Sequence, residues 1–253
     1  MKASASSTQA VRDYWQGHPC GSSLSQAESG SNQFFHEIEE ARYRQEPFIP
    51  DFAEFERWRG RRVLEVGVGL GTDFVRFARA GARLSGIDLT EASIELVRRR
   101  LALEGLAADL GVADAEELPF DDEALDLVYS WGVLHHAADP EKALTEIRRV
   151  LRPSGEARIM LYSRRSWVAL GLWARYALLR GHPWHSFGRV ISEHMESPGT
   201  KAYTQMELEE MFSGFRETIF IRFITPYDRR IAGPVADLLG SRFGWFVGVR
   251  AAR

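Results

Sequence analysis

The stretch Val63-Leu64-Glu65-Val66-Gly67-Val68-Gly69-Leu70-Gly71-Thr72-Asp73 decides the fold of this chain. A β-branched, apolar run passes through three alternating glycines into an amphipathic segment, which is the pattern of a strand, a tight loop and a helix. Glycine allows backbone conformations closed to other residues and lets a ligand approach the main chain. The stretch therefore predicts a ligand-binding loop, although a glycine turn that serves only strand-to-helix packing has the same short signature.

The spacing of glycines and acids in this region restricts the kind of ligand. A dinucleotide fingerprint, G-x-G-x-x-G, needs glycine at position 72, where this chain has Thr72. Glu65 lies at the strand end, where a carboxylate would repel a pyrophosphate but could accept hydrogen bonds from an ammonium group. Asp88 ends the next apolar stretch, about 20 positions after Gly67, the spacing at which an acid accepts hydrogen bonds from ribose hydroxyls. A cationic ligand fits these residues better than a dinucleotide.

At this point the sequence resembles the class I S-adenosylmethionine-dependent methyltransferases, whose first motif reads acid-x-G-x-G-x-G and whose second ends in an acid at the tip of strand two. The resemblance covers roughly residues 60 to 162 and continues through Ala113-Asp114-Ala115-Glu116-Glu117-Leu118-Pro119-Phe120, Leu125-Asp126-Leu127-Val128-Tyr129-Ser130-Trp131-Gly132-Val133-Leu134-His135-His136 and Arg148-Arg149-Val150-Leu151-Arg152-Pro153-Ser154-Gly155. Ser154 departs from the Pro-Gly-Gly turn that is common in the family. That turn precedes a strand, so the departure has little bearing on the cofactor.

The resemblance implies a fold, a cofactor and a set of binding residues. The fold is an α/β, Rossmann-like, doubly wound sheet of seven mostly parallel strands with an antiparallel last strand, and the cofactor is S-adenosylmethionine. In family members an N-terminal helical segment often closes over the cofactor, which makes Tyr14 and Tyr43 candidate contacts, unless they are only packing aromatics. The cofactor-binding residues that the motifs imply are Glu65, Gly67, Gly69, Gly71, Asp88, Leu89, Asp114, Ala115 and Ser130.

Apolar runs at 62–67, 83–88, 109–113, 124–130 and 157–162, separated by helical patterns, predict the parallel strands, and 218–224 and 243–249 predict two more. Domain organisation follows from these segments. We expect a disordered, serine-rich leader at 1–10, an N-terminal lid at 11–59, and a methyltransferase domain at 60–253. A cap insertion is expected at 163–203, after the fifth strand.

Composition narrows the class of partner. The chain has 253 residues, 45% of them hydrophobic, with a net charge of −3 and a pI of about 6.2. No broad basic field is available for nucleic acid, and Ser130-Trp131-Gly132-Val133 replaces the Pro-Pro-aromatic motif of related enzymes that methylate adenine in nucleic acids. The single cysteine, Cys20, excludes an intrachain disulfide, and no stretch is long and apolar enough for a membrane span. We therefore expect a cytoplasmic protein that binds a small-molecule acceptor, without nucleic acid.

The arginine-bracketed apolar segment 164–180 has three interpretations. It can form a cap over a hydrophobic substrate, which we favour, a homodimer surface, or a helix that contacts a membrane surface. The histidine-containing loop after it lacks the spaced Cys/His pattern of a zinc site, so no metal is expected.

The resulting hypothesis is a methyltransferase that transfers a methyl group by in-line displacement to a small, fairly apolar metabolite. If the acceptor needs deprotonation, the candidate general bases are His136, His135, His36 and His194, although each of the paired histidines can equally be a packed residue. One alternative is a non-catalytic S-adenosylmethionine-binding module that regulates or scaffolds a partner. A nicotinamide-dependent oxidoreductase is a further alternative, which Thr72 argues against. The acceptor, and whether oxygen, nitrogen, carbon or sulfur is methylated, are left open.

Overall fold

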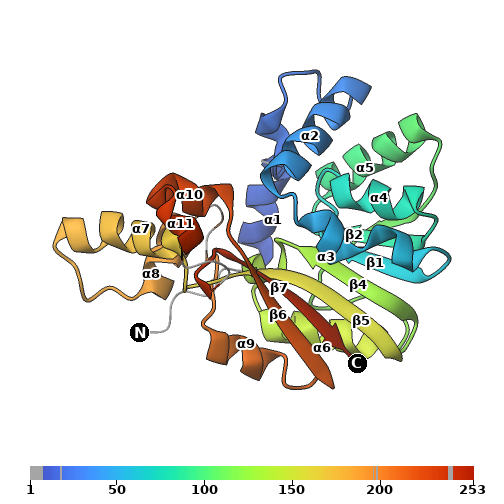
Figure 1. Cartoon of the computed structure of the whole chain (residues 1–253). Coiled ribbons are helices and arrows are strands. Elements are labelled where there is room, and N and C mark those ends of the chain that lie inside the picture. The colour runs from blue at the N-terminus through green and yellow to red at the C-terminus, as the bar shows by residue number, and fades with distance from the viewer. Residues whose placement is uncertain (1–7, 18, 196, 198, 239–241) are drawn as a thin grey trace.

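The computed structural model describes residues 8–17, 19–195, 197, 199–238 and 242–253. In this part of the chain a seven-stranded sheet has the order β3-β2-β1-β4-β5-β7-β6 (Figure 1). Strands β1 to β5 are parallel to one another, and β7 is antiparallel to both β5 and β6. This arrangement confirms the predicted fold. The strands are β1 Arg62–Val66, β2 Arg83–Asp88, β3 Asp109–Val112, β4 Leu125–Trp131, β5 Leu151–Tyr162, β6 Glu217–Phe223 and β7 Phe246–Ala252.

Helices precede, connect and follow these strands. The α-helices are α1 Thr8–Gly17, α2 Asn32–Gln45, α3 Ile49–Ala53, α4 Thr72–Arg79, α5 Glu91–Glu104, α6 Pro140–Val150, α7 Trp167–Tyr176, α8 Phe187–His194, α9 Gln205–Met211, α10 Pro226–Ala232 and α11 Val235–Leu238. Short 3-10 turns are η1 Ser22–Leu24, η2 Phe55–Trp58, η3 Leu134–His136 and η4 Leu178–Arg180.

The sheet is covered on both faces because successive side chains of a buried strand point in opposite directions. Val63 of β1 and Leu127 of β4 belong to a core shared with α3, α4 and α5. Leu64 and Val128, one position further along each strand, belong to a second core shared with α6 and α9. Both faces of the central strands are therefore buried, as expected of a parallel sheet.

Two groups of helices stand beyond the carboxyl ends of the central strands, where ligands bind in open α/β sheets. The first consists of α1 and α2. The second consists of α7, α8, α10 and α11, which pack on one another at one end of the sheet (Figure 1). These two groups come from the N-terminal segment, the insertion after β5 and the β6–β7 connection.

Several predicted boundaries need correction. Helix α1 already begins at Thr8, so residues 8–10 are not part of a disordered leader; residues 1–7 lie outside the described residues. Strand β5 begins at Leu151, six residues before the predicted start. The expected helix over 164–180 is divided into α7 and η4, separated by Ala177. Thr90, Asp139 and Thr204 are the N-caps of α5, α6 and α9.

Candidate functional site

The three loop glycines all have positive φ, but they serve different purposes. At Gly67, with φ 79°, an added Cβ would lie 2.3 Å from Cγ2 of Val133, and at Gly71 it would lie 3.0 Å from Val97. At Gly69, with φ 51°, nothing lies within 4 Å of an added Cβ. Gly67 and Gly71 therefore allow close packing of the protein, while Gly69 exposes its backbone to open space. The close approach of a ligand expected at Gly67 is better assigned to Gly69.

Asp88 connects this loop to the end of β2. One carboxylate oxygen, Oδ2, accepts a 3.0 Å hydrogen bond from the Gly69 backbone N–H, and Oδ1 accepts 2.9 Å and 2.8 Å bonds from the backbone and hydroxyl of Thr90. Thr90 is also the N-cap of α5. The carboxylate is thereby fixed in orientation, and Oδ2, which accepts only one of these bonds, has a second lone pair for a ligand.

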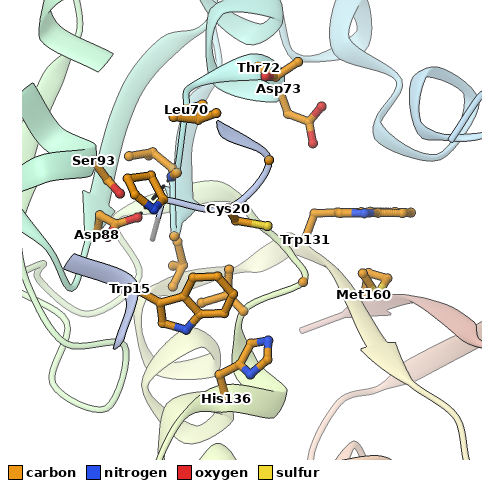
Figure 2. A pocket seen from close by; sticks show the side chains of 18 of the residues that line it. Trp15, Cys20, Leu70, Thr72, Asp73, Asp88, Ser93, Trp131, His136 and Met160 are labelled. Carbon is orange, nitrogen blue, oxygen red and sulfur yellow. Dashed lines mark hydrogen bonds between the residues drawn. The ribbon is translucent and has the colours of Figure 1, made fainter. Parts of the chain in front are cut away.

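A cavity of about 420 Å³ begins at this loop and extends past the ends of β4 and β5 (Figure 2). That volume is within the range of small-molecule and cofactor sites. Of the predicted cofactor residues, those that line it are Glu65, Gly67, Gly69, Asp88, Leu89, Asp114 and Ala115. The glycine loop and the ends of β2 and β3 therefore form one side of a single cavity.

A buried polar cluster closes the cavity at the ends of β1 and α2. The Arg42 guanidinium donates a 2.9 Å hydrogen bond to Asp73 Oδ2, which also accepts from the Tyr129 hydroxyl at 2.9 Å. Tyr43 donates to the other Asp73 oxygen at 2.9 Å. Glu46 accepts a 3.0 Å bond from the Trp131 indole and lies 3.8 Å from Arg42.

Glu65 also belongs to this cluster, but one of its carboxylate oxygens has no hydrogen-bond donor in the described part of the chain. Its side chain is buried, and among the described residues Oε2 has no hydrogen-bond donor. Burial, and then the nearby Asp73 carboxylate, raise the pKa of Glu65 well above its ordinary value. Glu65, Glu46 and Asp73 together face the single guanidinium of Arg42, and all four line the cavity. The cluster therefore favours a ligand that brings a positive charge and hydrogen-bond donors.

The far side of the cavity is apolar and aromatic. Trp131 and Met160 come from the ends of β4 and β5 (Figure 2), and Val168 and Leu172 from α7. We call this apolar side the acceptor chamber, and the lining residues next to Trp131 and Met160 also include Tyr162, Met195, Tyr227, Trp245 and Phe246. Val11, Trp15 and Leu24 line the cavity from the N-terminal segment. The insertion after β5 contributes Val168, Leu172 and Met195 to the chamber, and Tyr227, Trp245 and Phe246 come from the β6–β7 region, which the sequence did not indicate.

His136 is the candidate base that reaches the cavity. Its Nδ1 lies 2.7 Å from the hydroxyl of Ser197 and 3.1 Å from that of Thr200, and the edge of Trp15 meets its ring at a centroid distance of 5.2 Å. Burial, and then the positive charge of Lys201, lower the pKa of His136 to about 3. The imidazole is therefore neutral near pH 7, as a general base must be.

The other predicted bases do not line the cavity. His135 is fully buried beneath Tyr162, at a ring distance of 3.7 Å, and burial lowers its pKa well below the ordinary value. His36 is exposed on α2 and lies 3.5 Å from Glu40. His194 is exposed on α8 and stacks on Tyr176 at 4.1 Å. These three histidines are therefore not placed to act as bases on a ligand in the cavity.

Four predicted cofactor contacts are also not among the lining residues. Gly71 is the N-cap of α4, and the Ser130 hydroxyl donates to the Val66 carbonyl at 3.1 Å. Tyr43 supports Asp73, as described above. Tyr14 contacts Trp15 edge-on at 5.0 Å, and it is Trp15 that lines the cavity. These four residues therefore lie behind the residues that line the cavity.

The fold and the cavity together define the class of protein. It is a Rossmann-like α/β protein with an acid-x-G-x-G-x-G loop and an acid, Asp88, at the spacing expected for binding ribose hydroxyls. Comparison with known proteins agrees, because residues 64–159 match a family model described as a methyltransferase domain. Residues 64–159 therefore belong to a class I S-adenosylmethionine-dependent methyltransferase domain, and S-adenosylmethionine is the methyl donor of that family.

Curated relatives resemble only part of this chain. A demethylmenaquinone methyltransferase of Clavibacter sepedonicus is 38% identical over 104 residues, which are 41% of this chain and 42% of the relative. A ubiquinone biosynthesis O-methyltransferase of Rhizobium leguminosarum bv. trifolii is 31% identical over 145 residues, 56% of this chain and 58% of the relative. The chain thus spans about two to three fifths of the length of these relatives.

The fold as a whole is similar to solved structures. The [4+2]-cyclase SpnF superposes with a TM-score of 0.61 at 16% identity, covering 100% of this chain and 99% of that chain. At this identity the likeness concerns the fold alone, and it shows that the fold by itself does not define a reaction.

Proposed function

We propose that this protein is a methyltransferase that uses S-adenosylmethionine to methylate a small, apolar acceptor. The observation that carries the proposal is the division of one cavity into a polar cradle, formed by the glycine loop with Glu65, Asp88 and Asp114, and the apolar acceptor chamber. A cofactor and an acceptor bound in one cavity can meet without crossing solvent. The names of the two relatives above indicate quinones or their precursors as acceptors, which agrees with an apolar, aromatic chamber.

The cradle suits S-adenosylmethionine on its own chemistry. Asp88, held by Gly69 and Thr90, would accept hydrogen bonds from the ribose hydroxyls, and Asp114 and Ala115 would border the adenine. Glu65 would accept from the α-ammonium group, and Arg42 would face the carboxylate. The unpartnered Glu65 oxygen and the open space above Gly69 are the two features that such a ligand would satisfy.

The cofactor supplies a methyl group already activated by the positive sulfonium sulfur. The protein is therefore left with orientation, exclusion of water and, for a hydroxyl acceptor, removal of a proton. Orientation alone supplies ~7–11 kcal/mol in well-aligned intramolecular reactions. The aromatic walls of the chamber exclude water, and His136 is the neutral imidazole beside it that can accept the proton.

Calorimetric titration with S-adenosylmethionine and, separately, NADH tests the cofactor assignment. We expect binding of S-adenosylmethionine and none of NADH; the reverse result would support an oxidoreductase. Incubation with methyl-labelled S-adenosylmethionine and a panel of quinols then distinguishes an enzyme from the alternative of a non-catalytic binding module, because only an enzyme yields a labelled quinol ether or C-methylated product.

A further inference from the structure

Large apolar side chains are exposed mainly on one group of helices. Thirteen such side chains are exposed among the described residues; seven of them lie on α7, η4, α10 and α11, and an eighth, Trp184, lies in the loop between η4 and α8. Leu179, Leu238 and Trp184 are 81%, 80% and 73% exposed, values that leave these side chains almost entirely in water. We call the eight the cap patch: Leu170, Leu178, Leu179, Trp184, Tyr227, Ile231, Val235 and Leu238.

The helices that carry the cap patch pack together rather than standing apart. Helix α7 contacts α8, α10 and η4, and α10 contacts α11. Gly171 of α7 allows this approach, because an added Cβ there would lie 3.0 Å from Ile231 of α10. The helices that carry these side chains, and the loop with Trp184, therefore form one packed unit, which Figure 1 shows at one end of the sheet. A monomeric soluble protein rarely collects its exposed apolar residues in this way unless they mark an interaction site.

The same unit is basic in a chain that is acidic overall. Segment 163–203 contains six basic residues and two acidic ones, whereas the chain carries a net charge of −3. Four arginines of this unit have no acidic partner within 4.0 Å among the described residues: Arg165, Arg175, Arg180 and Arg230. Arg175 and Arg180 lie over the Tyr176 ring, at 5.3 Å and 5.0 Å from its centroid. Cationic charge beside exposed apolar side chains complements an anionic lipid surface.

The cap patch is also continuous with the acceptor chamber. Tyr227 belongs to both, being 47% exposed and at the same time part of the cavity lining. Val168 and Leu172 line the cavity from α7, the helix that carries Leu170 of the patch. A lipid-soluble acceptor held in a bilayer would therefore meet the protein next to its chamber.

We propose that the cap patch docks this protein on the surface of a membrane containing anionic lipids, with the acceptor chamber next to the lipid. The docking follows from the patch and its arginines, whereas the delivery of an acceptor rests on the function proposed above. No helix in the described part of the chain is long and apolar enough to cross a bilayer, so the contact is peripheral.

Vesicle flotation of the full chain, without cofactor or acceptor, tests the docking. Vesicles of phosphatidylcholine alone are compared with vesicles that also contain phosphatidylglycerol, at low and high salt. We expect the unmodified chain to bind the anionic vesicles, and this binding to weaken with salt. In Arg175→Gln/Arg180→Gln the affinity should fall by about 5-fold for each arginine removed. In Leu179→Ser/Leu238→Ser the affinity for the vesicles should fall markedly.

Matched controls are Met206→Ser, which alters an equally exposed apolar side chain on α9, and Arg61→Gln/Arg83→Gln, which removes two exposed arginines outside the cap. Both should bind anionic vesicles as the unmodified chain does. The proposal is overturned if the unmodified chain does not bind anionic vesicles, if the controls lose binding as the patch variants do, or if the patch variants abolish only self-association in sedimentation velocity. Vesicle binding by a chain that fails to bind S-adenosylmethionine would leave the docking intact and remove the proposed function.

Discussion

The backbone N–H of Gly69 and the carboxylate of Asp88 are joined by a 3.0 Å hydrogen bond, so the loop after β1 is held by the acid that ends β2. Asp88 thus has a structural partner before any ligand arrives. Substitutions at Asp88 therefore have to distinguish its role in binding the cofactor from its role in holding the loop.

Asp88→Ala should weaken S-adenosylmethionine binding by about 1.5–3 kcal/mol, the range for hydrogen bonds to a charged group. Asp88→Asn keeps one acceptor oxygen and should lose less. Calorimetric titration of both variants measures the effect, with Glu210→Gln, an exposed acid on α9, as control. Unchanged affinity in Asp88→Ala would exclude Asp88 from the cradle.

Glu65→Gln should weaken cofactor binding by about 1.5–3 kcal/mol, because glutamine cannot form the carboxylate that would face the ammonium group of the bound cofactor. It should also stabilise the ligand-free protein near neutral pH. The pKa of Glu65 is raised in the folded state, so the folded protein keeps a proton that the unfolded chain releases above its ordinary value of 4.5. This contribution to stability is lost as pH rises through the raised pKa.

Urea denaturation of the unmodified chain and Glu65→Gln at pH 5 and pH 8 measures that contribution. The stability advantage of the variant should be larger at pH 8. Equal differences at the two pH values would mean that Glu65 titrates normally and is not a strained, buried acid.

The glycine loop can be tested by alanine substitution at two positions with different surroundings. Gly67→Ala places a Cβ against Val133 and should lower the free energy of unfolding by about 2–4 kcal/mol, from positive-φ strain plus overpacking. Gly69→Ala meets no protein atom and should mainly weaken cofactor binding. Gly105→Ala, at φ 65° with open space around it, reports the strain alone. Normal cofactor affinity in Gly69→Ala would show that the ligand does not approach this backbone.

Because a pKa of about 3 makes the His136 imidazole a weak base, His136→Gln should lower turnover by about 10², the low end of the usual contribution of a general base, and leave S-adenosylmethionine affinity nearly unchanged. His194→Gln, an exposed histidine outside the cavity, is the control. Turnover that survives in His136→Gln would assign the histidine to packing and indicate an acceptor that needs no base.

The depressed pKa of His136 also has a consequence for acid stability. The unfolded chain protonates this histidine near its ordinary pKa of 6.5, whereas the folded chain does so only near 3. The resulting stabilisation is present above pH 6.5 and is lost as pH falls towards 3, about 2 kcal/mol of it by pH 5. Denaturation of His136→Gln should show a correspondingly smaller loss of stability between pH 7 and pH 5.

The sequence was most informative where neighbouring residues determine the structure. The strand before Gly67 and the acid at the end of the next strand, Asp88, are local patterns, and each lies where it was predicted. Contacts between distant residues were not predictable in this way. The pairing of Trp131 with Glu46 spans 85 positions, and the approach of Ser197 to His136 spans 61.

The acceptor chamber shows the same limit. Tyr227 and Trp245 enter it because β7 inserts between β5 and β6, an arrangement that carries the β6–β7 connection to the cavity. Trp167 and Trp173 lie in the apolar segment that was interpreted as a cap over the substrate, but they pack on Phe243 and Phe187 and do not line the cavity. An apolar pattern on a helix predicts burial, but it does not tell which buried side chains reach a cavity.

The central claim, that one cavity binds the methyl donor and an apolar acceptor together, is tested most directly by labelled methyl transfer in a variant with a filled chamber. Leu172→Trp would occupy the acceptor side, and Leu103→Trp, at an exposed position on α5, is the matched control. We expect label from S-adenosylmethionine to reach a quinol in the unmodified chain and in Leu103→Trp, and Leu172→Trp to bind S-adenosylmethionine normally while transferring almost none. Equal transfer by Leu172→Trp, or no transfer by any form that binds S-adenosylmethionine, would contradict the account.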